Sequence, residues 1–265
     1  MRRLLLPTLL PTLLALFLCL LAQGAGASDF EREKRWAAEI VPALVVGDPV
    51  YLKAATGKDF LSLFTEAKNA DSAVVIVHGT GVHPDHGVIG SLRVTLADAG
   101  ITTLAIQMPI AAKEATVNDY YPQLFPDASN RIAIAADFLQ KKGYRKIALV
   151  SHSMGSWMSN VYLDETPNPP YATWVCMGLT GGFTARLFGV SVPMLSVKIP
   201  ILDIFGENDV TPGVVAAAGR RLTSLEGVPG SRQVKITGAD HYFNGKGNEL
   251  AVTIAAYLKE RWSKQ

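Results

Sequence analysis

Apolar runs rich in β-branched residues alternate along the chain with segments whose apolar residues recur every three to four positions. This alternation is typical of a mostly parallel sheet with helices on both faces, and continuous apolar runs are typical of strands buried on both faces. The apolar runs predict strands at 73–78, 102–107, 146–151, 173–178, 199–205 and 233–237. The helical periodicity predicts helices at 87–99, 128–142, 154–164, 213–225 and 248–263. We therefore expect an α/β fold built on a twisted, mostly parallel sheet.

The region before the first of these strands has a different pattern. Residues 49–54 and 59–64 predict a leading antiparallel hairpin. The charged segment 29–40 predicts a helix that packs outside the sheet.

The first 27 residues have the order of a secretory leader. Two arginines at positions 2–3 precede a leucine-rich run, and small residues Ala-Gly-Ala occupy positions 25–27. A membrane anchor is the alternative, but two prolines interrupt the run, which is short against the roughly 20 apolar residues of a spanning helix. We expect cleavage after Ala27, a periplasmic or secreted location, and no stable membrane span in the mature chain.

Removal of that leader leaves a mature chain, residues 28–265, with no net charge. The whole chain has 25 basic and 23 acidic residues, and the leader contains two arginines and no acid. Without a long basic run there is no electrostatic footprint for nucleic acid or an anionic membrane, so a small molecule is the expected partner. Cys176 is the one remaining cysteine and excludes an intramolecular disulfide. The length suits a single α/β domain, and the oligomeric state is left open.

The stretch VSHSMGSW at 150–157 places one serine, Ser153, directly between a predicted strand and a predicted helix. It resembles the nucleophile elbow of the α/β-hydrolase superfamily, whose pattern is G-x-S-x-G. Ser151 replaces the first glycine, while Gly155 matches the second. The alternative is a serine that only caps a helix, which is common at such junctions.

A serine nucleophile needs a base and an orienting acid, and in α/β-hydrolases these follow it in the order acid, then histidine. His241 is the one histidine that follows both Ser153 and the candidate acids, and it comes directly after the last predicted strand. A solvated loop histidine is the alternative. We therefore predict His241 as the base.

Four acids near the last two predicted strands are candidate partners of His241. Asp209 is favoured because it follows the strand 199–205 in a turn that points an acid off the carboxyl end. Glu207 is a second possibility in the same turn. Asp203 lies within the apolar strand and fits a structural carboxylate, and Asp240 is too close in sequence to approach His241 from another strand end.

The segment His78-Gly79-Thr80-Gly81 ends the first predicted parallel strand. It resembles the hydrolase loop whose backbone N–H completes the oxyanion hole with the N–H of the residue after the nucleophile. The expected donors are the Thr80 and Met154 N–H groups, and Gly79 is predicted with them to bind the oxyanion or substrate. A tight glycine turn or a phosphate loop is the alternative, but no Walker pattern or strand-linked G-x-G-x-x-G is present, so no cofactor is expected.

The His83-Pro-Asp-His86 stretch raises the question of a metal site. Such crowded neighbours, stiffened by Pro84, are poorly placed to supply the three or four ligands of zinc. We predict instead that this loop lines the rim of the site and contacts substrate, and no metal is expected.

The resemblance to α/β-hydrolases covers residues 73–110, 131–163 and 197–243. HGTGVHPD, GITTLAIQMPI and LDIFGEND also resemble a family of uncharacterised exported bacterial α/β-hydrolase-like proteins. This resemblance implies a fold and a reaction class and leaves the substrate open. The late acid and histidine are not uniformly kept in that family, so the set Ser153, Asp209 and His241 favours activity here.

Asp209 follows Ser153 by only 56 positions, which leaves little room for a cap domain. The apolar segment 183–197 is either a small flap or core packing. The predicted function is an exported serine hydrolase that cleaves a small-molecule carboxylic ester or thioester through an acyl-enzyme. Two alternatives stay open: a non-catalytic binding protein of the cell envelope with the hydrolase fold, and a peptidase or amidase with the same three residues.

Overall fold

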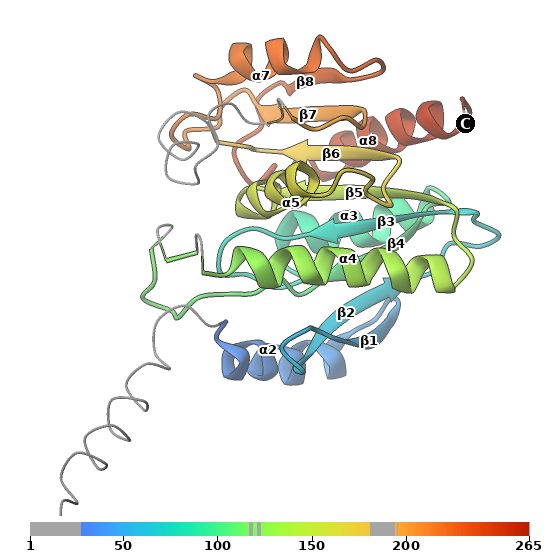
Figure 1. Cartoon of the computed structure of the whole chain (residues 1–265), viewed down its shortest axis with the longest axis vertical. Helices are drawn as coiled ribbons and strands as arrows, with labels where there is room; N and C mark the ends of the chain where they lie inside the picture. Colours follow the sequence, from blue (N-terminus) through green and yellow to red (C-terminus); the bar gives the residue numbers. More distant parts are fainter. Residues whose placement is uncertain (1–27, 117–118, 121–122, 181–193, 195, 265) are drawn as a thin grey trace, which may run out of the picture.

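An eight-stranded sheet runs through the computed structural model, which describes residues 28–116, 119–120, 123–180, 194 and 196–264 (Figure 1). The strand order is β1-β2-β4-β3-β5-β6-β7-β8, with all pairs from β4 to β8 parallel. The strands are β1 (Asp48–Lys53), β2 (Asp59–Thr65), β3 (Ser72–Val77), β4 (Thr102–Ile106), β5 (Lys146–His152), β6 (Thr173–Met177), β7 (Ile201–Gly206) and β8 (Arg232–Ile236). The predicted mostly parallel sheet is confirmed.

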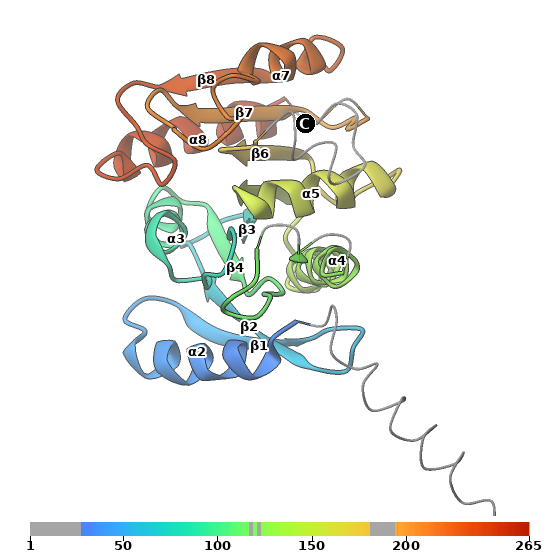
Figure 2. The same cartoon turned by 90° about the vertical axis from the view of Figure 1, so that its left-hand side faces the viewer.

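Helices cover both faces of the sheet, as Figure 2 shows. They are α2 (Phe30–Ala43), α3 (Gly87–Asp98), α4 (Phe125–Lys141), α5 (Met154–Glu165), α7 (Ala218–Leu225) and α8 (Gly247–Trp262). The side chains of α4 and α5 pack with one face of the sheet in a first core, and those of α3 and α8 pack with the other face in a second core. Strands β3, β4, β6 and β7 are buried along their whole length, and β5 is buried after its first residue, because both faces are covered.

The predicted leading hairpin is β1 paired antiparallel with β2. Strand β2 also pairs antiparallel with β4, so the hairpin extends the parallel sheet at one edge. Helix α2 packs against β2, and its first turn is capped by Asp29, whose carboxylate accepts a hydrogen bond from the Arg32 N–H at 3.0 Å.

Two helices begin three or more residues away from their predicted first residue. Helix α4 begins at Phe125, three residues early, because Pro126 is tolerated in a first turn where its missing N–H has no helical acceptor. Helix α7 begins at Ala218 rather than at 213, because Gly213 has φ +84° and the residues after it form turns. One of those turns presents the Val214 carbonyl to Arg221 at 2.8 Å.

Asp203 is a structural carboxylate, as its place within the apolar strand predicts. Its oxygens accept hydrogen bonds from Arg221 Nε at 2.9 and 3.1 Å and from Gln233 Nε2 at 2.7 Å. Both members of the ion pair have fully buried side chains. Asp203 therefore joins β7, α7 and β8 and is committed to these partners.

The parallel strands all end at one edge of the sheet. Ligand sites of open α/β sheets lie outside this edge, and the loops that carry His78, Ser153, Asp209 and His241 all leave it.

Most of the predicted flap at 183–197 lies outside the described residues. Within the described residues, no helix is long and apolar enough to cross a membrane.

The ion pair of Asp203 gives a test of the core. We expect Asp203→Ala to lower the free energy of unfolding by about 3–5 kcal/mol, because it leaves the Arg221 guanidinium buried without its carboxylate. Lys141→Ala is the matched control, since it removes an exposed ion pair with Asp137 and should cost about 0.5 kcal/mol or less. Urea unfolding at pH 7 measures both; equal losses would contradict the assignment.

Candidate active site

Ser153 occupies a sharp turn between β5 and α5. Its backbone has φ 55° and ψ −120°, a region that residues with a side chain rarely adopt. A Cβ on Gly155 would come 2.4 Å from the His78 carbonyl oxygen, so only glycine fits where the helix passes the end of β3. At the other small position, the Ser151 hydroxyl accepts a hydrogen bond from Trp174 Nε1 at 2.7 Å. The serine that replaces the first glycine of the pattern therefore has its own buried partner.

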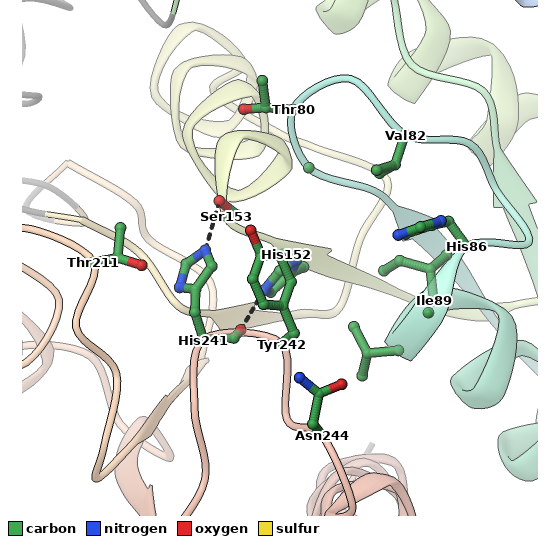
Figure 3. Close-up of a pocket in the computed structure, with 13 residues that line it drawn as sticks. Thr80, Val82, His86, Ile89, His152, Ser153, Thr211, His241, Tyr242 and Asn244 are labelled. Carbon is green, nitrogen blue, oxygen red and sulfur yellow. Dashed lines mark hydrogen bonds between the residues drawn. The ribbon is translucent and has the colours of Figure 1, made fainter.

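Three predicted site residues form a continuous line of hydrogen bonds, and Figure 3 shows the bond between His241 and Ser153. His241 Nε2 lies 2.9 Å from Ser153 Oγ, and His241 Nδ1 lies 2.7 Å from Asp209 Oδ2. A neutral imidazole that donates its Nδ1–H to the carboxylate leaves Nε2 free to accept the serine proton. The structure thus brings together Ser153 of the β5–α5 turn, Asp209 after β7 and His241 after β8.

The environment of Asp209 favours its ionised form. Burial opposes ionisation, but hydrogen bonds from His241 and from the Thr211 N–H, at 2.8 Å, outweigh it and lower the pKa of the carboxyl. An ionised Asp209 fixes the tautomer and the direction of the His241 ring.

The other candidate acids are engaged elsewhere. Glu207 accepts from Lys235 Nζ at 2.8 Å and from the Gly238 N–H at 3.0 Å. Asp240 organises its own loop by accepting from the Tyr242 and Asn244 backbone N–H groups, both at 3.0 Å. Among the acids weighed from the sequence, Asp209 is the one hydrogen-bonded to His241.

The loop after β3 passes directly over Ser153. A Cβ on Gly79 would lie 3.1 Å from the Ser153 Cβ, which is tighter than ordinary contact, so glycine permits this approach. Thr80 follows and lines the same pocket as Ser153, and no described residue accepts a hydrogen bond from its N–H. Met154 is the first residue of α5, where an N–H has no intrahelical acceptor. Both backbone donors predicted for an oxyanion thus lie beside the serine.

The His78 side chain holds the loop after β3 in place. Its Nδ1 lies 2.8 Å from the Gly79 carbonyl oxygen, and its Nε2 accepts the Met108 N–H at 2.9 Å, which fixes the Nδ1–H tautomer. Burial lowers the pKa of His78 to about 3. The ring is therefore neutral and serves as a rigid link between two backbone segments.

His152 and Gly178 support His241 and were not predicted from the sequence. The centroids of the His152 and His241 rings lie 4.9 Å apart with the rings tilted by 45°, and His152 Nε2 lies 2.8 Å from the His241 carbonyl oxygen. Burial lowers the pKa of His152 to about 4, so it stays neutral and donates to that carbonyl. A Cβ on Gly178 would lie 3.1 Å from His241 Cε1. In the sequence, the feature that could have indicated His152 is its position next to Ser153. The corresponding feature of Gly178 is only its position after a predicted strand.

A pocket of about 300 Å³ opens above Ser153 and His241. Its other lining residues are Gly79, Thr80, Val82, His86, Gly87, Val88, Ile89, His152, Thr211, Tyr242 and Asn244. The 83–86 loop reaches it through His86, while the His83 ring packs edge-to-face against Trp36 at 5.5 Å. Across the described ranges, no group of three side chains is arranged to hold a metal ion.

Comparison with solved structures identifies the fold. A dienelactone hydrolase from Anabaena variabilis is 21% identical, with a TM-score of 0.62 over 80% of this chain and 97% of that one. Est1E from Butyrivibrio proteoclasticus, solved with ferulic acid, is 13% identical, with a TM-score of 0.65 over 81% and 99%. An alpha-beta serine hydrolase homologue from Coxiella burnetii is 14% identical, with a TM-score of 0.62 over 80% and 98%. The chain has the α/β-hydrolase fold.

Sequence comparison adds one match. The family model described as "Protein of unknown function (DUF3530)" matches residues 30–128, a span that includes the loop after β3 but ends before Ser153. No curated protein matches the chain in sequence.

The strained turn gives a prediction about stability. Ser153→Gly and Ser153→Ala both remove the hydroxyl, but only glycine adopts φ 55° and ψ −120° without steric cost. We expect Ser153→Gly to be more stable than Ser153→Ala by about 1 kcal/mol, after the greater entropy of glycine in the unfolded chain is subtracted. Thermal unfolding of the two variants measures the difference, and a less stable glycine variant would contradict the strain.

Proposed function

We propose that this chain is an exported serine hydrolase that cleaves carboxylic esters or thioesters through an acyl-enzyme on Ser153. The observation that supports the proposal is the hydrogen-bonded line from Asp209 through His241 to Ser153. The hydrolase fold and the N–H groups of Thr80 and Met154 beside the serine are consistent with the same chemistry.

In the first half of the reaction, Ser153 Oγ attacks the acyl carbon while His241 Nε2 takes its proton. The imidazolium that forms is stabilised by Asp209, and the oxyanion accepts hydrogen bonds from the Thr80 and Met154 N–H groups. His241 then gives the proton to the leaving alcohol or thiol as the bond to the acyl carbon breaks, which leaves an ester of Ser153.

In the second half, a water molecule replaces the leaving group. His241 takes a proton from the water as the oxygen attacks the acyl carbon, and returns it to Ser153 Oγ as the acyl-enzyme bond breaks. The products are a carboxylic acid and the regenerated serine. The His241 side chain accepts and donates the proton in each of these transfers.

The pocket supports a small substrate. Its volume of about 300 Å³ lies at the lower end of small-molecule sites, and Val82, Val88 and Ile89 give it an apolar wall. His86, Tyr242 and Asn244 add polar groups that could orient the substrate. Two fold neighbours, a dienelactone hydrolase and an Est1E solved with ferulic acid, are consistent with a small substrate of this class.

Export is the remaining part of the proposal. The basic, apolar and small-residue order of the first 27 residues supports removal of a leader after Ala27 and a mature chain that acts outside the cytoplasm.

Activity-based labelling tests the nucleophile. We expect a fluorophosphonate probe to label Ser153 in the chain 28–265, with the adduct located by mass spectrometry. Labelling should be lost in Ser153→Ala, which lacks the nucleophile, and in His241→Ala, which lacks the base. A folded protein that does not react would instead favour the non-catalytic binding protein, and hydrolysis retained by Ser153→Ala would overturn the mechanism.

The acid is tested by a matched pair of variants. Asp209→Asn should lower kcat for a small ester by about 10⁴-fold, because the amide no longer holds the His241 tautomer. Glu207→Gln, two residues away and paired with the exposed Lys235, should leave kcat within about twofold. Equal effects of the two substitutions would contradict the assignment of Asp209.

A further inference from the structure

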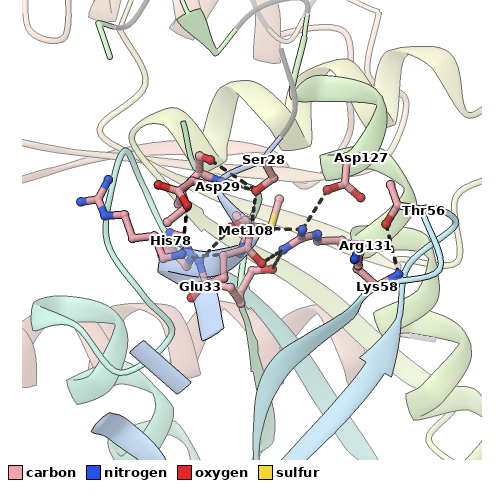
Figure 4. Close-up of polar contacts among 12 residues, drawn as sticks. Ser28, Asp29, Glu33, Thr56, Lys58, His78, Met108, Asp127 and Arg131 are labelled. Atoms are coloured by element: carbon pink, nitrogen blue, oxygen red, sulfur yellow. Dashed lines mark hydrogen bonds and ion pairs between the residues drawn. The ribbon is translucent and has the colours of Figure 1, made fainter. Parts of the chain in front are cut away.

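A second buried polar cluster lies at the start of α2 and α4, apart from the residues of the candidate active site (Figure 4). Arg131 is its centre, with a side chain that has no exposed area. Arg131 Nη1 and Nη2 donate to the two oxygens of Glu33 at 2.8 and 3.2 Å, and Nη2 also donates to Asp127 Oδ2 at 2.8 Å. One guanidinium thus serves two carboxylates.

The two carboxylates of this cluster share the single guanidinium of Arg131. Burial raises the pKa of Glu33, although the Arg131 charge opposes the rise. Asp127 Oδ1 is a buried oxygen for which no described residue supplies a hydrogen bond. A buried carboxylate without a counter-charge is costly, so the cluster has room for one more cation that can donate hydrogen bonds.

Ser28 lies against the same carboxylates. Its hydroxyl donates to Glu33 Oε1 and accepts the Ile110 N–H at 3.0 Å, and the next residue, Asp29, donates its N–H to the Ile110 carbonyl at 2.7 Å. Ser28 and Asp127 line one cavity of about 410 Å³. Only a few covalent bonds separate the Ser28 nitrogen from the hydroxyl that touches Glu33, so an ammonium group on that nitrogen would be close to this carboxylate.

We propose that the second cation of this cluster is the α-ammonium group of Ser28, which exists only after the leader has been removed. Hydrolysis of the 27–28 peptide bond by a leader peptidase adds one water, leaves a carboxylate on Ala27 and converts the Ser28 amide nitrogen into an ammonium group. That group pairs with the excess charge of Glu33 and Asp127. The inference rests on the proposed export, and it makes removal of the leader a step that completes the fold.

The cluster is linked to the oxyanion loop. Arg131 Nη1 donates to the Gln107 carbonyl at 3.0 Å, and the next residue, Met108, donates its N–H to His78 Nε2. His78 in turn contacts the Gly79 carbonyl. Ser28 and Arg131 are therefore positioning residues for the loop that approaches Ser153.

The charged groups around the Ser28 ammonium group decide whether the stability of the chain rises or falls with pH. The charged groups of the elements around Ser28 are Asp29, Arg32 and Glu33 at α2 and Asp127 and Arg131 at α4. Lys58 is exposed, and its backbone N–H contacts the cavity-lining Thr56. His78 is neutral because burial lowers its pKa to about 3. Pairing with the excess carboxylate raises the pKa of the amine above its ordinary value of about 7.7–8.0. The resulting stability is fully present below about pH 7.7 and is lost as the pH rises through the raised pKa.

The first experiment measures that amine in the chain 28–265, which contains every described element of the fold. An N-terminal fusion is cut so that Ser28 carries a free amine, and the pH dependence of its acetylation by trace acetic anhydride gives its pKa by mass spectrometry. We expect a value at least about one unit above the ordinary one. Asp127→Asn should lower it by about one unit, whereas Asp137→Asn, exposed on the same helix, should leave it unchanged. An ordinary pKa in the unsubstituted chain would overturn the proposal.

The second experiment moves the amine by one residue. The chain 27–265 retains Ala27, so Ser28 has a neutral amide, and we expect a lower Tm and a kcat for a small ester about tenfold lower at unchanged KM. Equal Tm values for the two chains would also overturn the proposal. The amine pKa and the Tm do not depend on hydrolysis, so they test the inference even if the protein hydrolyses no ester.

Discussion

The strained backbone at Ser153 is the constraint on which the rest of the site depends. A residue with φ 55° and ψ −120° persists only where its surroundings hold it. Here β5 is buried in the middle of the sheet, α5 begins at the next residue, and Gly155 lets the helix pass within contact of the end of β3. Packing on both faces of the sheet therefore supports the strain, and the strain presents the serine hydroxyl to His241.

Buried neutral histidines hold the parts of the site in place. His78 joins the loop that carries Gly79 to the segment after β4, and His152 holds the carbonyl of His241. Burial lowers the pKa values of His78 and His152 far below neutrality, so each keeps one nitrogen as donor and the other as acceptor. Histidine thus has a structural role at His78 and His152 and a proposed catalytic role at His241. Burial and hydrogen bonds distinguish these roles.

Two buried arginines organise the periphery in different ways. Arg221 fits Asp203 alone, so their charges cancel within the interface of β7 and α7. Arg131 faces both Glu33 and Asp127, so two carboxylates share one guanidinium beside Ser28. The same physical rule, that a buried charge needs a partner, explains a closed structural pair at one place and predicts a missing cation at the other.

The sequence by itself determined the alternation of strands and helices, because hydrophobic period and β-branched runs are local properties. It also determined the order Ser153, Asp209, His241 and the place of each after a strand, because parallel strands end at one edge of the sheet. It placed the start of α7 too early, since the turn at Gly213 depends on the contact of Arg221 with Val214. Only the tertiary structure decided which acid reaches His241, that His152 and Gly178 support its ring, and that Ser28 lies against Arg131 and Glu33. These relations join residues far apart in the chain, and their physical basis is burial and charge pairing, which no local pattern contains.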